Sequence, residues 1–487
     1  MASVQEKDKI CAIFIHAGAG FHSVENERKH LKACENAAKA AMAFLRNGGT
    51  AVDAVEVAIM VLEDAPITNA GYGSNLNIKG GVECDATIVD HWGRSGAVGA
   101  VPNVKNPIML ARKIFEHAHK PLGLQRVPPN FLVGEGAKDF AWDHGLVIVP
   151  DEVLITPTSM ERWRTWCKDV DRFERQHQEA RPTDPWHRRP VTPISTRLAR
   201  ASLPALSNTI EADLASTRES EPVPMESESL QIDKLLDGQR TQASSESKPQ
   251  EADGTFPVDP RLSGEPASET GVHDHVTEPG GDNKDEDMIT DTVGAIAIDQ
   301  CGNIAAGSSS GGIGMKHQGR IGPAALIGIG THVMPVDPRD QDHTSVAVVT
   351  SGTGEHIATT LAASTCASRV YYSQKMGQTG GLESVTEEEA ISAMINAEFT
   401  GVNKSLIFGA IGIMAVKSNT DGIALYFAHN TDSFVSSTKA QLMDWSADSI
   451  SQALASMSSK DEKPSCVMSR NRHKGLVAQG GTMYRHK

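Results

Sequence analysis

The chain has 487 residues and a formal net charge of −15, a length that fits two or three ordinary domains or one large domain with a big insertion. Its acidic balance disfavours binding to a nucleic-acid backbone, and no run of residues has the length and apolar character of a membrane span. The seven cysteines are scattered and form no CxxC pair, which argues against a disulfide framework and a zinc site and favours a reducing compartment.

The first region that we expect to fold, residues 1–159, has a polar start that does not resemble a secretory signal. Residues 11–15 are apolar and predict a short buried strand, and a glycine-bearing turn that contains His16 follows them. Residues 25–47 have the apolar spacing of an amphipathic helix. A second helix is expected to begin at Thr50, which opens a capping-box pattern.

A change of composition marks an insertion over residues 160–288. Arginines cluster between Arg188 and Arg200, and residues 209–288 are rich in Glu, Ser, Asp, Pro and Gly with a single aromatic residue, Phe256. Such a segment buries too little apolar surface to offset the entropy of ordering, so we expect the insertion to be disordered.

Regular structure is expected again from residue 292 to residue 487. We expect helices at residues 355–372 and from Thr386 onward, and strands at residues 293–298, 325–329, 345–350, 411–416 and 423–429. Strands and helices on both sides of the insertion indicate one α+β unit that the insertion interrupts.

The bond between Asp291 and Thr292 is the most informative position for chemistry. Thr292 follows the polar insertion and directly precedes an apolar strand. If that bond is cut, Thr292 gains a free α-amine beside its hydroxyl, so that nucleophile and base lie on one residue. The reference pKa of such an amine, about 7.7 to 8, leaves a useful fraction of it neutral near physiological pH.

Later segments offer groups that could assist this threonine, and each also has an ordinary structural interpretation. Ser310 lies in a glycine-rich run, which is also typical of a turn between strands; its spacing fits neither common phosphate-binding motif. Arg320 could bind a carboxylate, although a lone arginine is usually a surface residue. Ser351 and Gly352 could bind an oxyanion, although a capped helix start is the commoner meaning of such a sequence. His16 is more often a structural histidine than a catalytic base.

The order of these motifs resembles the plant-type asparaginase family of N-terminal-nucleophile hydrolases, and within it the threonine aspartase (taspase) branch. The motifs that carry the family resemblance are HAGAG from His16, NAGYGSN from Asn69, ECDA from Glu83, GAVGA from Gly96, DTVG from Asp291, SGG from Ser310 and GE from Gly354. The taspase branch is favoured by LED from Leu62, KNP from Lys105, FLVGEGA from Phe131, WDHG from Trp142 and SGTGEH from Ser351.

This resemblance implies a four-layer αββα sandwich that matures by cleavage between Asp291 and Thr292 into chains of 291 and 196 residues. It implies neither a metal nor a cofactor. The roles that it implies are nucleophile and base for Thr292, assistance to the threonine hydroxyl for Ser310, binding of the substrate aspartate for Arg320, and the oxyanion hole for Ser351 and the Gly352 amide.

Two departures from the asparaginase pattern favour the protease branch. Asparaginases of this family have an Asp three residues after the arginine, where it binds the free α-amine of a small substrate, whereas this chain has Pro323. The oxyanion position that is usually threonine is Ser351. A third difference, Thr353 in place of the cysteine usual in taspases, carries no expectation.

We therefore expect a threonine endopeptidase that cleaves protein substrates after aspartate. Family precedent suggests nuclear regulatory proteins as substrates, a homodimer of αβ units, a nuclear or cytoplasmic location, and neither nucleic acid nor membrane as a partner. Two alternatives stay open. One is a β-aspartyl peptidase or L-asparaginase that acts on small amides, and the other is an uncleaved, non-enzymatic scaffold.

Overall fold

The computed structural model describes residues 9–179, 292–401, 409–443, 464–471 and 476–485. Helix α5 (Pro157–Glu179) extends into the expected insertion, so the expectation of disorder is wrong for residues 160–179. The remainder of that insertion, the arginine cluster and Asp291 lie outside the described residues.

The first sheet has eight strands in the order β14-β13-β1-β5-β6-β2-β3-β4, and only the β3–β4 pair at its edge is parallel. Its strands are β1 (Lys9–Gly20), β2 (Cys84–Val89), β3 (Ser95–Val101), β4 (Phe131–Val133), β5 (Val293–Ile298), β6 (Ile304–Ser310), β13 (Ser433–Met443) and β14 (Ser465–Arg470). The register of β1 against β5 runs from Ala12↔Ile298 to His16↔Gly294. The two segments that flank the expected insertion therefore pair at the centre of one sheet.

The second sheet has five antiparallel strands in the order β15-β12-β11-β8-β7. Its strands are β7 (Thr331–Met334), β8 (Ser345–Gly352), β11 (Ile411–Asn419), β12 (Gly422–His429) and β15 (Ala478–Arg485). A separate hairpin is formed by β9 (Gln374–Met376) and β10 (Leu382–Ser384).

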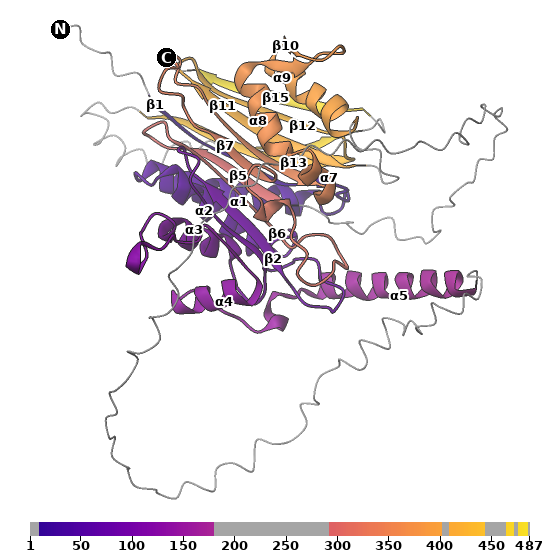
Figure 1. Ribbon diagram of the computed structural model, residues 1–487. Coiled ribbons are helices and arrows are strands. Elements are labelled where there is room, and N and C mark those ends of the chain that lie inside the picture. The colour runs from indigo at the N-terminus through magenta and orange to yellow at the C-terminus, as the bar shows by residue number, and fades with distance from the viewer. Residues whose placement is uncertain (1–8, 180–291, 402–408, 444–463, 472–475, 486–487) are drawn as a thin grey trace, which may run out of the picture. The chain divides into compact units, whose positions relative to one another are not determined.

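Helices cover the outer face of each sheet (Figure 1). The first sheet is covered by α1 (Glu27–Arg46), α2 (Ala51–Glu63), α3 (Pro107–His117) and α4 (Gly134–Asp143). The second sheet is covered by α8 (Ala362–Tyr372) and α9 (Glu387–Ala393), with the short α7 (Gly354–Thr359) at the end of β8. Short 3-10 helices span Gly123–Gln125, Asp151–Leu154 and Pro323–Ala325, and a π-helix spans Met394–Phe399.

Alternation along β1 shows how the sequence builds these layers. Ile13 and Ile15 belong to the apolar core between the first sheet and its helices, whereas Phe14 belongs to the core between the two sheets. Because successive strand residues point to opposite faces, one apolar strand contributes to two cores. A third core lies between the second sheet and α8–α9. Three cores separate four layers, which confirms the predicted αββα arrangement.

Local capping signals in the sequence are confirmed by hydrogen bonds. Both Thr50 and Thr386 cap their helices with complete capping boxes. The expected strand at 325–329 is wrong, because residues 323–325 form a 3-10 turn and the strand begins at Thr331. The helix expected at 355–372 is two helices, separated at Leu361, whose φ of 48° is incompatible with a continuous right-handed helix.

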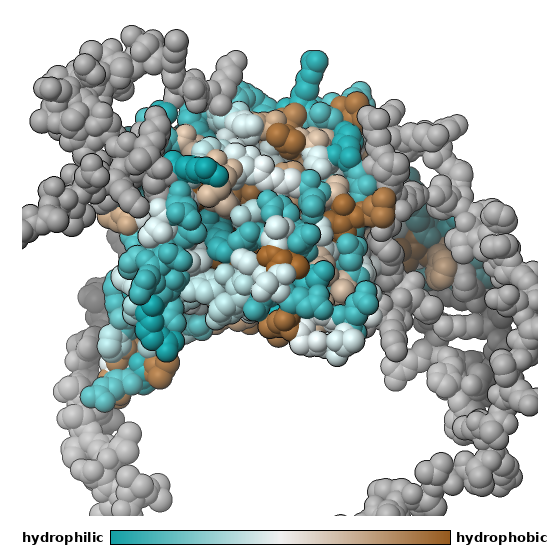
Figure 2. Space-filling model, turned by 90° about the horizontal axis from the view of Figure 1, so that it is seen from above, coloured by the Kyte–Doolittle hydropathy of each residue, from teal (hydrophilic) through white to brown (hydrophobic). Residues whose placement is uncertain are grey.

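The face of the molecule seen in Figure 2 is mainly hydrophilic, with hydrophobic residues in small separate groups among the described residues. Of the helices that the structure describes, none combines the length and the apolar character needed to cross a bilayer.

Candidate functional site

Thr292 lies immediately before β5 and is 5% exposed. Its backbone N–H donates to the Oγ of Ser351, which belongs to β8 of the second sheet, at 3.2 Å. The same Oγ accepts the N–H of Ala19, from β1, at 3.1 Å. Thr292 and Ser351, predicted from distant parts of the sequence, are therefore brought together where the two sheets meet.

Ser310 is the last residue of β6, which pairs with β5 in a register that sets Val293 opposite Ser309. Continued by one residue, this register sets Ser310 opposite Thr292. Ser310 is buried, and its Oγ accepts the backbone N–H of Gly312 at 3.0 Å. This hydrogen bond spans residues 310–312 and forms a tight turn at the end of β6.

Gly352 follows Ser351 in a conformation that favours glycine. Its φ is 137°, and a Cβ at this position would lie 2.2 Å from the carbonyl oxygen of Ala410. Thr353 fixes the next step of the turn, since its N–H donates to the Ala410 oxygen at 2.8 Å and its Oγ1 accepts the Ala410 N–H at 3.1 Å. Thr353 thus has a structural role in this turn, which sequence patterns did not predict.

Arg320 is 15% exposed and lies among glycines. A Cβ on Gly312 or Gly322 would lie 3.2 or 2.8 Å from its Nη1, and a Cβ on Gly354 would lie 2.5 Å from its Nη2. The guanidinium therefore occupies space that side chains at these positions would fill. Its Nε and Nη2 donate to Oε1 of Glu355 at 3.0 and 2.8 Å. Residues 351–355 consequently contact both Thr292 and Arg320.

Asp85 supports the turn that follows Arg320, and sequence patterns predict no role for it beyond its motif. It is fully buried, and its carboxylate accepts the N–H groups of Gly322 at 2.7 Å and Ala100 at 2.8 Å. Burial raises the pKa of Asp85, while Lys316, these two donors and Arg320 oppose the rise. The pairing of β2 with β6, which sets Asp85 opposite Ser310, and the hydrogen bond to Gly322 place this residue near the site.

Helix α5 packs against the loops that carry the site. Its Arg162 donates to Asn75 Oδ1 at 3.3 Å, and the Trp163 indole N–H donates to the Asn77 carbonyl at 2.9 Å. Trp166 fills the space above Gly314, where a Cβ would lie 1.8 Å from its ring. Sequence composition missed this helix because its ordering depends on contacts with remote loops.

His16 is fully buried between the sheets, opposite Gly294 in the β1–β5 register. Its ring stacks on Phe434 at 5.5 Å, and neither ring nitrogen has a hydrogen-bond partner among the described residues. Burial lowers the pKa of His16 to about 3, so the imidazole is neutral at physiological pH. It packs two residues along β5 from Thr292.

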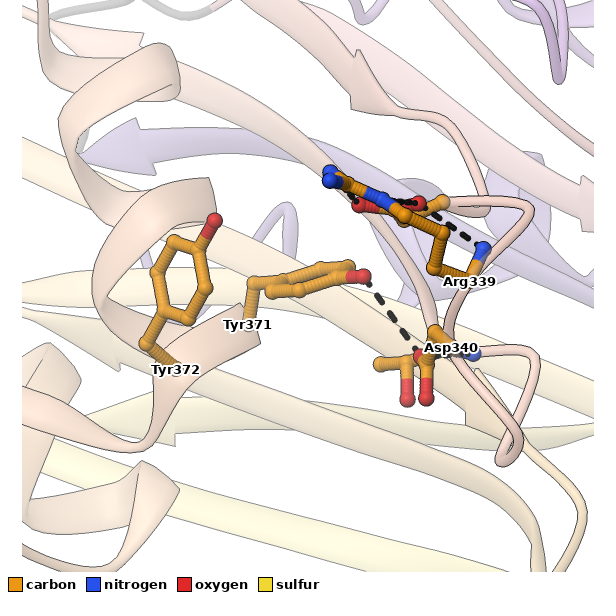
Figure 3. A pocket seen from close by; sticks show the side chains of 6 residues that line it. Arg339, Asp340, Tyr371 and Tyr372 are labelled. Carbon is orange, nitrogen blue, oxygen red and sulfur yellow. Dashed lines mark hydrogen bonds and ion pairs between the residues drawn. The ribbon is translucent and has the colours of Figure 1, made fainter.

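A surface hollow of about 610 Å³ lies elsewhere (Figure 3). Its lining residues are Asp337, Arg339, Asp340, Thr344, Tyr371 and Tyr372. The hydroxyl of Tyr371 points toward Asp340, with the two oxygens 3.5 Å apart. Thr344 precedes the first residue of β8, whereas Ser351 is near its last, and a strand of this length spans roughly 20 Å or more. The hollow is therefore separate from Thr292 and Ser351.

A family model described as asparaginase matches residues 9–191 and 215–433. The chain is 41% identical over 155 residues to an isoaspartyl peptidase/L-asparaginase of Danio rerio, which covers 31% of the chain and 46% of that protein. It is 28% identical over 371 residues to a putative isoaspartyl peptidase/L-asparaginase of Dictyostelium discoideum. This match covers 75% of the chain and 80% of that protein. It is 26% identical over 408 residues to an isoaspartyl peptidase of Salmonella typhimurium. This match covers 79% of the chain and 92% of that protein. The match to the first group of curated animal relatives spans about half their length.

Proposed function

The chain belongs to the asparaginase family of N-terminal-nucleophile hydrolases, and from that premise we propose that it is a threonine endopeptidase that cleaves proteins after aspartate. The proposal includes maturation by self-cleavage between Asp291 and Thr292. It also retains the division into residues 1–159, an insertion over 160–288 and a catalytic unit over 292–487. Helix α5, which ends at Glu179, forms the start of that insertion.

Thr292 is the proposed nucleophile. In the uncut chain its nitrogen is an amide that donates to Ser351 Oγ; cleavage converts the same nitrogen into an amine able to take the threonine proton. Thr292 Oγ then attacks the aspartyl carbonyl, and the protonated amine gives its proton to the leaving amine. Water hydrolyses the resulting ester and restores the free threonine.

Ser351 and Gly352 are the proposed oxyanion hole. The Ser351 hydroxyl accepts two backbone N–H groups, from Thr292 and Ala19, and these occupy both of its lone pairs. Its single proton is then left to donate to the oxygen that becomes negative during attack, together with the Gly352 amide. Ser310, opposite Thr292 in the register, is proposed to donate its hydroxyl proton to Thr292 Oγ.

The observation that carries the endopeptidase proposal is Pro323. Arg320 supplies a guanidinium for the substrate aspartate. In asparaginases of this family an Asp three residues later holds the free α-amine of a small substrate, and a proline side chain has no group that binds an amine. Pro323 is buried at the start of the 3-10 helix that follows Arg320. A substrate whose amine is already in a peptide bond makes no demand on this position.

A second function is favoured by the names of the relatives, which are isoaspartyl peptidases and L-asparaginases. Such an enzyme would use the same nucleophile and arginine on a small β-aspartyl substrate with a free amine and α-carboxylate. We propose it as the alternative. Nuclear regulatory proteins as substrates, a homodimer of αβ units and a nuclear or cytoplasmic location also remain proposals that rest on family resemblance.

Matched substrates separate the two functions. The processed enzyme is given an acetylated, amidated peptide with an internal aspartate, free L-asparagine, and a β-aspartyl dipeptide, and kcat/KM is measured for each. The proposal expects the blocked peptide to be the best substrate. Turnover of the two small substrates with the peptide left intact would replace it by the alternative.

A further inference from the structure

Glu355 contacts Arg320 from one side only. Its Oε1 accepts hydrogen bonds from Nε and Nη2, which form the side edge of the guanidinium. The remaining terminal nitrogen, Nη1, lies beside Gly312 and Gly322. A guanidinium can bind carboxylates along either edge, so side-on contact with Glu355 leaves the edge formed by Nη1 and Nη2 for a second carboxylate.

The edge formed by Nη1 and Nη2 lies beside Gly312 and Gly354, which are close in sequence to Ser310 and Ser351. Gly312 follows Ser310 by two residues, its N–H donates to Ser310 Oγ, and Ser310 is set opposite Thr292 by the sheet register. Nη1 therefore lies on the side of Arg320 that approaches the nucleophile. A side chain on Gly312 would crowd this nitrogen, because its Cβ would lie 3.2 Å from Nη1 and 3.2 Å from Lys316 Nζ.

We propose that Glu355 is a positioning residue that holds Arg320 side-on, so that the terminal edge of the guanidinium selects the substrate carboxylate. This inference rests on the proposed function of Arg320. It adds a physical link between recognition and chemistry, because Glu355 is only four residues from Ser351 along one turn. A shift of that turn would move the oxyanion donors and the arginine together.

The exposure of the pair favours positioning over a plug that blocks the arginine. Glu355 is 61% exposed and Arg320 is 15% exposed, so the carboxylate approaches from solvent while the guanidinium is enclosed. Burial acts against the charge of Glu355, but its hydrogen bond and attraction to Arg320 outweigh this and lower its pKa. It is therefore ionised throughout the neutral range. A plug would compete with substrate, whereas a positioning group would assist it, and the two predict opposite changes in KM.

A matched control exists in the same chain. Arg369 donates from Nε and Nη2 to Glu398 at 2.8 Å each, which is the same pairing of residue types with two hydrogen bonds. Arg369 belongs to α8 and Glu398 to the π-helix after α9, in the outer layer of the second sheet. Loss of that pair removes the same number of hydrogen bonds to an arginine without touching Arg320, from a glutamate that is 17% exposed, against 61% for Glu355.

The experiment uses the full chain after processing and an acetylated, amidated peptide that reproduces residues 288–297, in which Asp291 is the single aspartate. Glu355→Ala should raise KM about tenfold with kcat within about twofold, because a charge-assisted hydrogen bond contributes about this much. Glu355→Gln should recover most of the lost affinity, because its amide oxygen accepts the same two N–H groups. Gly354→Ala, whose methyl would approach Nη2, should raise KM as well. Glu398→Ala should leave KM unchanged.

An unchanged or lower KM for Glu355→Ala would overturn the proposal, and a lower value would identify a plug. A loss confined to kcat, or an equal rise in KM for Glu398→Ala, would overturn it too. Exposed ion pairs contribute little to stability, so Glu355→Ala should fold, and an unfolded variant would also contradict the proposal. If the wild type cleaves only a β-aspartyl dipeptide, the endopeptidase proposal has failed. The same variants assayed on that dipeptide still test Glu355, because the α-carboxylate of the dipeptide would bind Arg320.

Discussion

Thr292 and Ser351 come from different sheets, and the Thr292 nitrogen lies 3.2 Å from the Ser351 Oγ. The nitrogen that cleavage would convert into a catalytic base is thus already held by the second sheet in the uncut chain. Folding, rather than cleavage, places Thr292, the proposed nucleophile, against Ser351.

Removal of the Thr292 hydroxyl should stop maturation. The Thr292→Ala chain should stay as a single band on denaturing electrophoresis during prolonged incubation, because no oxygen can attack the Asp291 carbonyl. Thr290→Ala, a control two residues before, should be processed into chains of 291 and 196 residues. Processing of Thr292→Ala at the same bond would show that another group performs the cut.

Loss of the Ser351 hydroxyl should slow catalysis more than binding. Ser351→Ala removes the acceptor for two N–H groups and the proposed donor to the oxyanion. Removal of one such donor lowers kcat about 10²- to 10³-fold in enzymes of known mechanism. Steady-state kinetics on the blocked peptide should show this with little change in KM. Ser345→Ala, at the opposite end of β8, is the control and should retain its kcat; an equal loss there would argue for a general effect on the strand.

Pro323→Asp should shift preference toward substrates with a free amine. The new carboxylate stands where asparaginases of the family bind that amine. We expect the ratio of kcat/KM for L-asparagine to kcat/KM for the blocked peptide to rise at least about tenfold, since a paired polar group discriminates strongly between substrates. Pro323→Ala supplies the comparison without a charge. Equal ratios for the Asp and Ala variants would show that position 323 does not select between the two kinds of substrate.

Glu63 should make the folded state less stable as pH rises. It is fully buried, and burial raises its pKa to about 8, although Ser309 and the Ile108 N–H donate to it. The native state therefore holds this proton above pH 4.5, where an unfolded glutamate releases it. The stabilisation is complete below that pH and is lost progressively as pH rises toward 8. Glu63→Gln, which cannot ionise, should flatten the dependence of Tm on pH between 5 and 8. Parallel curves for the two proteins would contradict this.

Sequence patterns were sufficient where structure is set locally. Capping boxes at Thr50 and Thr386 and the strand after Thr292 depend on neighbouring residues, and all are present. The strand predicted from the apolar run at residues 325–329 is wrong because Pro323 starts a 3-10 turn. Strand pairing begins at Thr331.

Tertiary contacts decided the features that sequence patterns missed. Helix α5 is rich in charge, and its order depends on Trp163 and Trp166 packing against remote glycine loops. The positions of Asp85 and Glu355 around Arg320 likewise follow from strand register and chain turns. Motif order identified residues that lie together, such as Thr292 and Ser351, but the hydrogen bonds between them needed the fold.

We propose that the bond before Thr292 is also the kind of bond that the enzyme cleaves in other chains. The most direct measurement is mass spectrometry of an acetylated, amidated peptide that reproduces residues 288–297, after incubation with processed enzyme and, in parallel, with Thr292→Ala. We predict two fragments from the wild type only, one ending at Asp291 and the other beginning with threonine. An intact peptide in the presence of enzyme that turns over L-asparagine or a β-aspartyl dipeptide would contradict the proposed cleavage of proteins after aspartate.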